Sequence, residues 1–203
     1  MQNNLKADSP TPSQPVAAPA HVYGTPRTLA FIDLETTGNP GSRVVELCVC
    51  LITGEGLVQG PYTRRFLPPV TIPWYATKIH GLADKDVANE LPFRARAPKL
   101  AQLLAGSILV AHAAAQCEVP VLQREFVDAK ENWPFHGIID TLPLARRIWP
   151  DAGTWKLLPL IKKLGLEQGQ AHTAEGDVAM LVRLWDQIYI KEGNACLPRE
   201  AML

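Results

Sequence analysis

The sequence predicts an α/β fold in which a mixed five-stranded sheet is flanked by helices. In the first part of the folded region, three apolar runs are separated by turn residues, which is typical of an antiparallel meander. In the later part, short apolar runs alternate with segments of helical spacing, which is typical of parallel strands joined by helices. A meander that leads into such an alternation predicts one mixed sheet.

Five segments are short, apolar and bounded by turn residues, so we expect them to be strands. They are residues 29–34, 44–53, 57–67, 107–112 and 138–141. Gly54 and Gly56 supply the turn between the second and the third strand. Residues 73–82 carry no such pattern, and we expect them to be irregular or to form a short helical turn.

Five other segments carry apolar residues at helical spacing or begin with a helix-start signal, so we expect them to be helices. They are residues 94–104, 120–127, 142–148, 155–164 and 173–189. Pro120 suits the first turn of its helix, and Gly165 suits a helix end. Large aromatic side chains are expected to pack in the core or between helices: Trp74, Tyr75, Trp149, Trp155 and Trp185.

Composition divides the chain into a folded domain and two tails. Residues 1–26 contain five of the 18 prolines and no apolar period, which predicts a flexible, Pro-rich tail that could tether a protein partner. The folded domain is predicted over residues 27–192, and a short C-terminal tail over residues 193–203. Lys+Arg and Asp+Glu both number 20, which excludes a strongly basic nucleic-acid coat and an acidic disordered chain.

The sequence also indicates where the protein resides. No apolar stretch is long enough to span a membrane, and the first residues lack the basic start and apolar core of a signal peptide. Four cysteines without a CxxC motif are typical of reduced thiols. We therefore expect a cytoplasmic protein with no membrane partner.

Two carboxylates occur where a buried strand is expected. Asp33 and Glu35 are two residues apart, so their side chains point to the same face of the strand. Two buried carboxylates repel each other and lose hydration, and a divalent cation would relieve both effects. The alternative is that the strand ends at Leu34 and Glu35 is solvated in the following turn.

A third carboxylate lies on the apolar side of the last predicted helix. Asp177 shares that side with Ala174 and Leu181, so it needs a partner if it is buried. The alternative is an acid at the helix start, stabilised by the helix dipole. His172 precedes the helix and would suit a general base, because histidines titrate near neutral pH. A cap or a surface residue is the alternative for His172.

These residues fall in motifs that resemble the DnaQ-like, DEDDh-type 3′–5′ exonucleases. Residues 31–38 (F-I-D-L-E-T-T-G) resemble the first motif of that family, and residues 172–177 (H-T-A-E-G-D) match its last motif, H-x-A-x-x-D. Residues 79–82 (I-H-G-L) resemble its His-Gly loop, and residues 139–150 resemble the segment before the last helices. The resemblance covers about residues 28–190 and implies a ribonuclease H-like fold.

The resemblance implies metal-dependent hydrolysis of phosphodiester bonds at 3′ ends, with release of nucleoside 5′-monophosphates. Two divalent cations, Mg²⁺ or Mn²⁺, would be held by Asp33, Glu35, Glu118 and Asp177, and His172 would be the base. Residues implied to contact the terminal nucleotide are Thr36, Thr37 and Gly38, with His80 and Leu82 bordering the pocket. The implied substrate is a single-stranded or frayed 3′ end, of DNA rather than RNA.

The middle motif departs from the family pattern H-N-A-x-F-D-x-x-F-L. Residues 112–122 read H-A-A-A-Q-C-E-V-P-V-L, so either Cys117 or, with one extra residue, Glu118 takes the place of the acid. Glu118 is preferred, because a hard cation binds a carboxylate better than a neutral thiol. An exoribonuclease and a catalytically impaired nucleic-acid-binding accessory subunit remain as alternatives to a DNA exonuclease.

Overall fold

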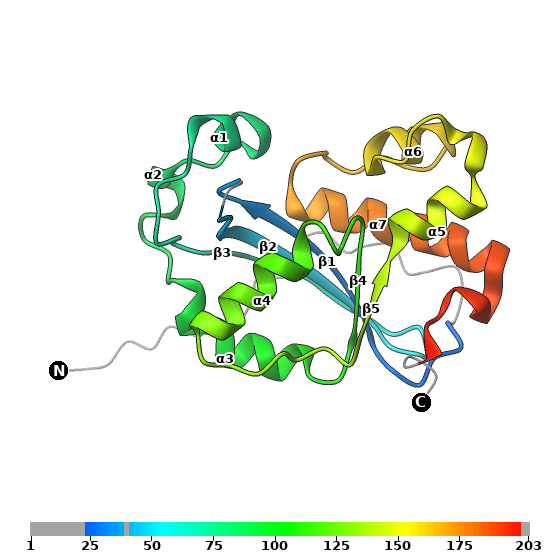
Figure 1. The fold of residues 1–203 in the computed structure, drawn as a ribbon, viewed down its shortest axis with the longest axis horizontal. Helices are drawn as coiled ribbons and strands as arrows, with labels where there is room; N and C mark the ends of the chain where they lie inside the picture. Colours follow the sequence, from blue (N-terminus) through cyan, green and yellow to red (C-terminus); the bar gives the residue numbers. More distant parts are fainter. Residues whose placement is uncertain (1–22, 39–40, 200–203) are drawn as a thin grey trace.

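The computed structural model describes residues 23–38 and 41–199, which form a sheet covered by helices on both faces (Figure 1). The strands are β1 (Leu29–Thr36), β2 (Val44–Ile52), β3 (Val58–Arg65), β4 (Ile108–Ala111) and β5 (Gly137–Asp140). Their order in the sheet is β3-β2-β1-β4-β5. The pairs β1–β2 and β2–β3 are antiparallel, and β1–β4 and β4–β5 are parallel, which confirms the predicted mixed sheet.

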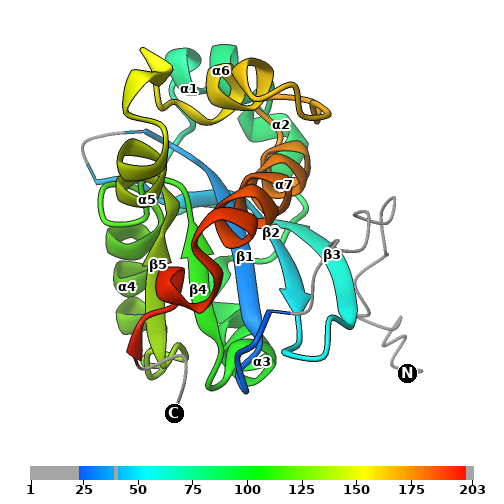
Figure 2. The ribbon, with the colours of Figure 1, turned by 90° about the vertical axis from the view of Figure 1, so that its right-hand side faces the viewer.

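Helices pack on both faces of the sheet. They are α1 (Trp74–His80), α2 (Asp84–Val87), α3 (Phe93–Leu104), α4 (Glu118–Asp128), α5 (Thr141–Ile148), α6 (Leu157–Lys163) and α7 (Ala174–Glu192). Two short 3₁₀ helices span Pro150–Ala152 and Gly193–Cys196. The helix α7 crosses over β1 and β2, as Figure 2 shows. The short helix α2 was not predicted, because four residues carry no periodic signal.

The side chains of β1 point alternately into two hydrophobic cores, one on each face of the sheet. Leu29 and Phe31 pack in the core beneath α5, α6 and α7, whereas Ala30 and Ile32 pack in the core beneath α3 and α4. Asp33 continues the α7-facing row of side chains, because successive strand residues point to opposite faces. The strand extends to Thr36, two residues beyond the predicted end at Leu34.

The structure corrects the two predicted tail boundaries. Tyr23 is fully buried and packs edge-on against Trp185 and Tyr189, and its Oη donates a hydrogen bond to Asp186. Residues 23–26 therefore belong to the domain and not to a flexible tail. At the other end, a 3₁₀ helix over Gly193–Cys196 follows α7, and Cys196 and the next residue, Leu197, lie in the core. The rest of the tail prediction, including the tether for a partner, lies outside the described residues 23–38 and 41–199.

The predicted aromatic positions are confirmed only in part. Trp185 is fully buried, and Trp149 and Trp155 pack against the same core. The prediction is wrong for α1, where Trp74 is 76% exposed and Tyr75 is 42% exposed. Within the described part of the chain, no helix is long and apolar enough to cross a lipid bilayer.

Tyr23→Ala is expected to destabilise the domain by about 3–5 kcal/mol, the usual cost of removing a buried aromatic ring. The ring packs in the core against Trp185 and Tyr189 of α7, and its hydroxyl also donates a hydrogen bond to Asp186. Urea unfolding of the wild type and the variant measures this loss. Deletion of residues 1–22, which carry none of the site motifs, is the control and is expected to leave both stability and turnover nearly unchanged. A Tyr23→Ala variant as stable as the wild type would contradict this packing.

Candidate active site

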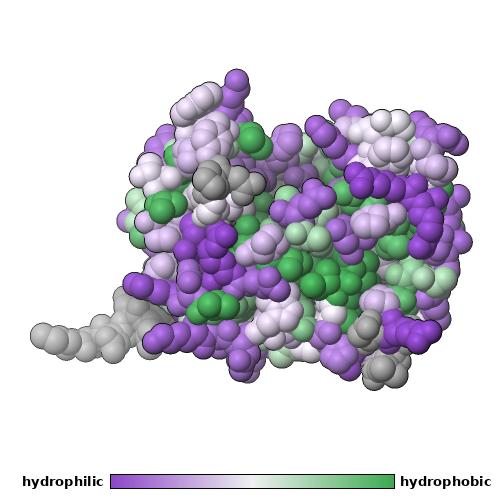
Figure 3. All heavy atoms as spheres, in the orientation of Figure 1, coloured by the Kyte–Doolittle hydropathy of each residue, from purple (hydrophilic) through white to green (hydrophobic). Residues whose placement is uncertain are grey.

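A cavity of about 340 Å³ opens beside the carboxyl ends of β1 and β4. Such an edge of a sheet is the usual place for a ligand in α/β folds. The cavity is lined by residues from β1, from the segment that leads into α4, and from the start of α7: Asp33, Leu34, Glu35, Thr36, Gly38, Ser42, His112, Gln116, Cys117, Glu118, Pro120, Val121, Arg124, His172 and Asp177. Figure 3 shows a hollow between the surface formed at α1 and that formed at α6.

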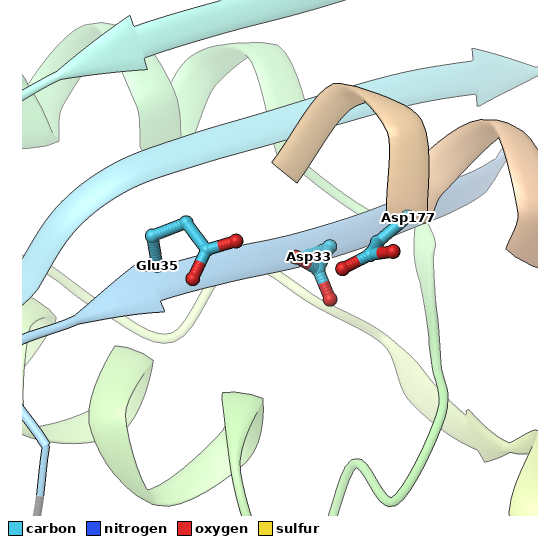
Figure 4. Close-up of side chains that lie close together, drawn as sticks. All are labelled: Asp33, Glu35 and Asp177. Carbon is cyan, nitrogen blue, oxygen red and sulfur yellow. The ribbon is translucent and has the colours of Figure 1, made fainter. Parts of the chain in front are cut away.

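Three carboxylates converge in this cavity (Figure 4). One oxygen atom from each of Asp33, Glu35 and Asp177 lies within 4.8 Å of the others. Asp33 and Glu35 point to the same face of β1, and α7 packs on that face and brings Asp177 to it. The alternative of a solvated Glu35 is wrong, because Glu35 lies within the strand and is buried.

The environment of these carboxylates opposes their ionisation. The pKa of Asp33 is raised well above its usual value by burial and by the charges of Glu118, Asp177 and Glu35. Burial and the charges of Asp177 and Glu46 raise the pKa of Glu35 to about 7. Burial also raises the pKa of Asp177, although His172 partly offsets this effect. A bound cation would replace the lost hydration and remove the repulsion.

Glu118 lies beside this cluster as the first residue of α4, while Cys117 is the exposed residue before the helix. The Glu118 side chain is buried, and its Oε2 atom has no hydrogen-bond partner among the residues that the structure describes. Burial, with a contribution from Asp140, raises the pKa of Glu118 to about 7. Glu118 lies outside the group of three oxygen atoms that converge within 4.8 Å, although its charge acts on Asp33. The three convergent carboxylates, with this buried oxygen nearby, are the hard donors that suit a divalent cation such as Mg²⁺ or Mn²⁺.

An ion-pair network fixes α4, and hence Glu118, against the sheet. Glu125 of α4 is buried, and its carboxylate accepts hydrogen bonds from Nε and Nη2 of Arg43 at 3.0 and 2.8 Å. The same carboxylate accepts the backbone N–H of Val44 at 3.0 Å, and Arg43 also pairs with Asp128. Because Arg43 and Val44 lie at the start of β2, the network ties α4 to the turn that follows the Asp33 strand.

His172 lies two residues before α7 and borders the cavity with an exposed side chain. It is not the helix cap: the Thr173 hydroxyl accepts the N–H of Gly176 at 3.1 Å. The backbone of His172 donates a hydrogen bond to the Asp177 carboxylate, and φ of His172 is 59°. A side chain at Gly176 would clash with the backbone of Gln170, so this glycine lets the preceding loop pack on α7.

The residues expected to contact a nucleotide divide into two groups. Thr36 and Gly38 line the cavity. Thr37 does not line it, and its buried hydroxyl instead accepts the N–H of Arg43 at 3.0 Å. His80 and Leu82 are also buried away from the cavity lining, and Nδ1 of His80 accepts the N–H of Leu82 at 3.1 Å.

Asp140 organises the loop that carries Glu118, and the sequence analysis did not identify it. Its carboxylate accepts hydrogen bonds from the backbone N–H groups of Ala113, Ala115 and Leu142. Ala113 adopts a left-handed φ of 67°, which few residues other than glycine adopt, so the loop before α4 is held in an unusual turn. One sequence signal could have identified Asp140: an acid that stands near the end of a predicted strand and just before a helix is commonly an N-cap.

His112 and Arg124 are two further cavity residues that the sequence analysis did not assign. The ring nitrogens of His112 lie 2.9 Å from the Thr141 hydroxyl and 2.6 Å from the carbonyl oxygen of Trp155. Nη1 of Arg124 donates to the carbonyl of Ser42 at 3.0 Å. His112 thus joins the end of β4 to α5 and to the segment before α6, whereas Arg124 places a positive charge at the cavity wall.

Comparison with known proteins identifies the family. The RNase T model, described as Exonuclease, matches residues 30–185. The chain belongs to this exonuclease family. The 3′–5′ exonuclease DinG of Bacillus subtilis is 30% identical over 149 residues, which are 72% of this chain and 16% of the relative. The DNA polymerase III subunit epsilon of Treponema pallidum is 25% identical over 185 residues, 87% of this chain and 85% of the relative.

Solved structures are similar to this chain in fold. Exonuclease X in complex with 5′ overhanging duplex DNA superposes with a TM-score of 0.65 and 25% identity, over 86% of this chain and 96% of that one. Escherichia coli exonuclease I in complex with a dT13 oligonucleotide gives a TM-score of 0.74 at 18% identity, over 83% of this chain and 42% of that one. These likenesses confirm the predicted ribonuclease H-like architecture.

Without metal, this protein is expected to lose stability as the pH rises from about 5 to about 7.5. Unfolded Asp and Glu release their protons near pH 4, whereas folded Glu35 and Glu118 keep theirs to about pH 7. Between these values the folded state binds more protons, so the free energy of unfolding falls with rising pH. We expect a fall of about 1–3 kcal/mol, or several degrees in Tm.

Thermal unfolding in EDTA at pH 5.5 and 7.5 measures this effect. Burial lowers the pKa of His80 and His112, which acts in the opposite direction. Glu35→Gln retains both histidines, so the difference between the variant and the wild type isolates the carboxylate. The variant is expected to lose less stability than the wild type across this interval. An equal loss in both proteins would contradict the assigned electrostatics.

Proposed function

We propose that this protein is a 3′–5′ exonuclease that removes nucleoside 5′-monophosphates from 3′ ends of DNA with the help of divalent cations. The observation that carries the proposal is the convergence of oxygen atoms of Asp33, Glu35 and Asp177 in one cavity. The buried Glu118 lies outside this group, but its charge acts on Asp33, and we assign it as the fourth ligand. Such a cluster is unfavourable without a cation and suited to hydrolysis with one.

In this proposal, Asp33, Glu35, Glu118 and Asp177 hold two divalent cations, Mg²⁺ or Mn²⁺. When bound, such cations activate a water and stabilise the oxygen that leaves from phosphorus. His172 accepts the proton from the water as its oxygen bonds to phosphorus. The bond from phosphorus to the 3′ oxygen breaks, and that oxygen takes up a proton from solvent, which yields a nucleoside 5′-monophosphate and a new 3′ hydroxyl. Thr36 and Gly38 contact the terminal nucleotide at the cavity wall.

DNA is the proposed substrate because of the relatives. DNA polymerase III subunit epsilon is named for a DNA polymerase, and exonuclease X was solved with 5′ overhanging duplex DNA. The proposed strand is single-stranded or frayed at its 3′ end, because the scissile bond must enter a recessed cavity. The DinG relative is much longer than this chain, so its other domains say nothing of the substrate here.

Matched single-stranded DNA and RNA oligonucleotides of one sequence, incubated with Mg²⁺ or with EDTA, test this proposal. We expect metal-dependent degradation of DNA that is faster than that of RNA, and no degradation in EDTA. Faster degradation of RNA would favour the exoribonuclease alternative. Binding of either strand without degradation would favour the accessory subunit.

His172→Ala is expected to lower kcat by about 10²–10⁴-fold, the usual contribution of a positioned base. Metal affinity is expected to change little, because His172 lies outside the three-carboxylate cluster. The pH dependence of kcat is expected to differ from that of the wild type, because the proton acceptor is removed. His136→Ala, at an exposed histidine that does not line the cavity, is the matched control. A profile that is unchanged in His172→Ala would assign the base to another group.

A further inference from the structure

The helix α1 presents an aromatic surface next to the cavity. Trp74 is 76% exposed and Tyr75 is 42% exposed, and their rings lie edge to face with centroids 6.2 Å apart. On the same short helix Ile79 is 59% exposed, and Lys78 is exposed one turn after Trp74. Large exposed aromatic side chains are unusual on a protein surface and mark a contact site when they gather.

This surface is continuous with the cavity wall through Gly38. Gly38 lines the cavity and has a φ of 77°. A Cβ atom at Gly38 would lie only 2.8 Å from Cε2 of Tyr75, so the tyrosine ring sits directly on this glycine. The aromatic pair therefore begins where the strand that carries Asp33 and Glu35 ends, and it extends from there to Trp74.

We propose that Trp74 and Tyr75 form a stacking platform for bases of the substrate strand next to the nucleotide that is removed. This inference rests on the proposed nuclease function and specifies how the strand is held. Aromatic rings stack on any base, because every base has a π-face, so the platform would bind without sequence preference. Lys78 supplies a positive charge beside Trp74, suited to a backbone phosphate.

The position of the platform determines which substrates use it. The terminal nucleotide enters the cavity at Asp33, so a base on Trp74 belongs to a nucleotide further along the strand. The platform therefore contributes to the binding of a long strand and not to that of a dinucleotide. It contributes to the ground state and the transition state alike, so its loss raises KM without lowering kcat.

The test compares kcat and KM of the wild type, Trp74→Ala and Trp74→Phe on dT8 and dT2 in Mg²⁺. Trp74 is mostly exposed, so its removal is expected to leave the fold intact. Trp74→Ala is expected to raise KM for dT8 by about 5- to 100-fold with kcat within about twofold, and Trp74→Phe is expected to restore most of the loss. KM for dT2 is expected to be unchanged. Val127→Ala on α4, 72% exposed and outside the cavity lining, is the control.

A binding arm separates this proposal from the nuclease proposal. Fluorescein-labelled dT8, and the same strand with abasic sites, are titrated with protein in EDTA, and anisotropy is recorded. The wild type is expected to bind the abasic strand as weakly as Trp74→Ala binds dT8. If the wild type hydrolyses nothing but binds dT8 more tightly than Trp74→Ala does, the platform would be upheld and the nuclease proposal overturned. Unchanged KM and unchanged binding in Trp74→Ala, with an active wild type, would overturn the platform alone.

Discussion

Asp33→Asn and Asp177→Asn are each expected to reduce hydrolysis by about 10³-fold or more, because each removes a charged ligand from the site. Both carboxylates belong to the group whose oxygen atoms converge within 4.8 Å. Initial rates on a 5′-labelled single-stranded DNA in Mg²⁺ measure the loss. Asp151→Asn, at an exposed aspartate outside the cavity lining, is the control and is expected to retain full activity.

A stability measurement shows whether this loss is chemical or structural. The charges in the cluster repel each other without metal, so replacing one of them relieves repulsion. In EDTA at pH 7.5, Asp33→Asn and Asp177→Asn are therefore expected to unfold at a Tm equal to or above that of the wild type. Addition of Mg²⁺ is expected to raise the Tm of the wild type more than that of either variant. Activity within a few-fold of the wild type in either variant would contradict the two-metal site.

Glu118→Gln is expected to lower both metal affinity and turnover by orders of magnitude, whereas Cys117→Ser is expected to change little. The glutamine keeps the shape of the side chain and removes the charge at a buried oxygen without a partner in the described structure. Cys117 is exposed, and although it borders the cavity, its neutral thiol is a poor ligand for Mg²⁺. Kinetics at varied Mg²⁺ concentration separate the loss of affinity from the loss of kcat.

The two variants also test the register of the middle motif. If Cys117→Ser were the damaging change and Glu118→Gln the harmless one, the alignment with one extra residue would be wrong. If neither variant lost activity, the site would work with three carboxylates. A Glu118→Gln protein that binds DNA as well as the wild type but fails to cleave it would confirm that Glu118 acts on the chemistry and not on the fold.

Local periodicity predicted the main elements of the fold and much of the site. The i, i+2 spacing of Asp33 and Glu35 predicted that both side chains share a face, and the place of Asp177 on the apolar side of α7 predicted that it needs a partner. The preference for Glu118 followed from ligand chemistry, and the structure buries this carboxylate while it exposes Cys117. The shared face of Asp33 and Glu35 and the burial of Glu35 are confirmed because each depended on one element and its geometry. The role of Glu118 as a ligand stays a prediction.

The errors arose where the local sequence does not show which side chains are buried and which face the cavity. Tyr23 is buried by Trp185, 162 positions later in the chain, which no local pattern of the Pro-rich segment indicates. Thr37 follows Thr36 directly, yet only Thr36 faces the cavity, and the motif alone does not say which side chain turns inward. Trp74 lies on a helix of seven residues, too short for its sequence to show which face is covered.

The direction of degradation tests the central claim most directly. One single-stranded DNA is labelled at its 5′ end in one sample and at its 3′ end in another, and both are sampled over time with Mg²⁺ and with EDTA. The site predicts that, with Mg²⁺ only, the 5′-labelled strand shortens stepwise while the 3′ label is released at once as a nucleoside 5′-monophosphate. Immediate release of the 5′ label, cleavage inside the strand, or equal degradation in EDTA would contradict a metal-dependent 3′–5′ exonuclease.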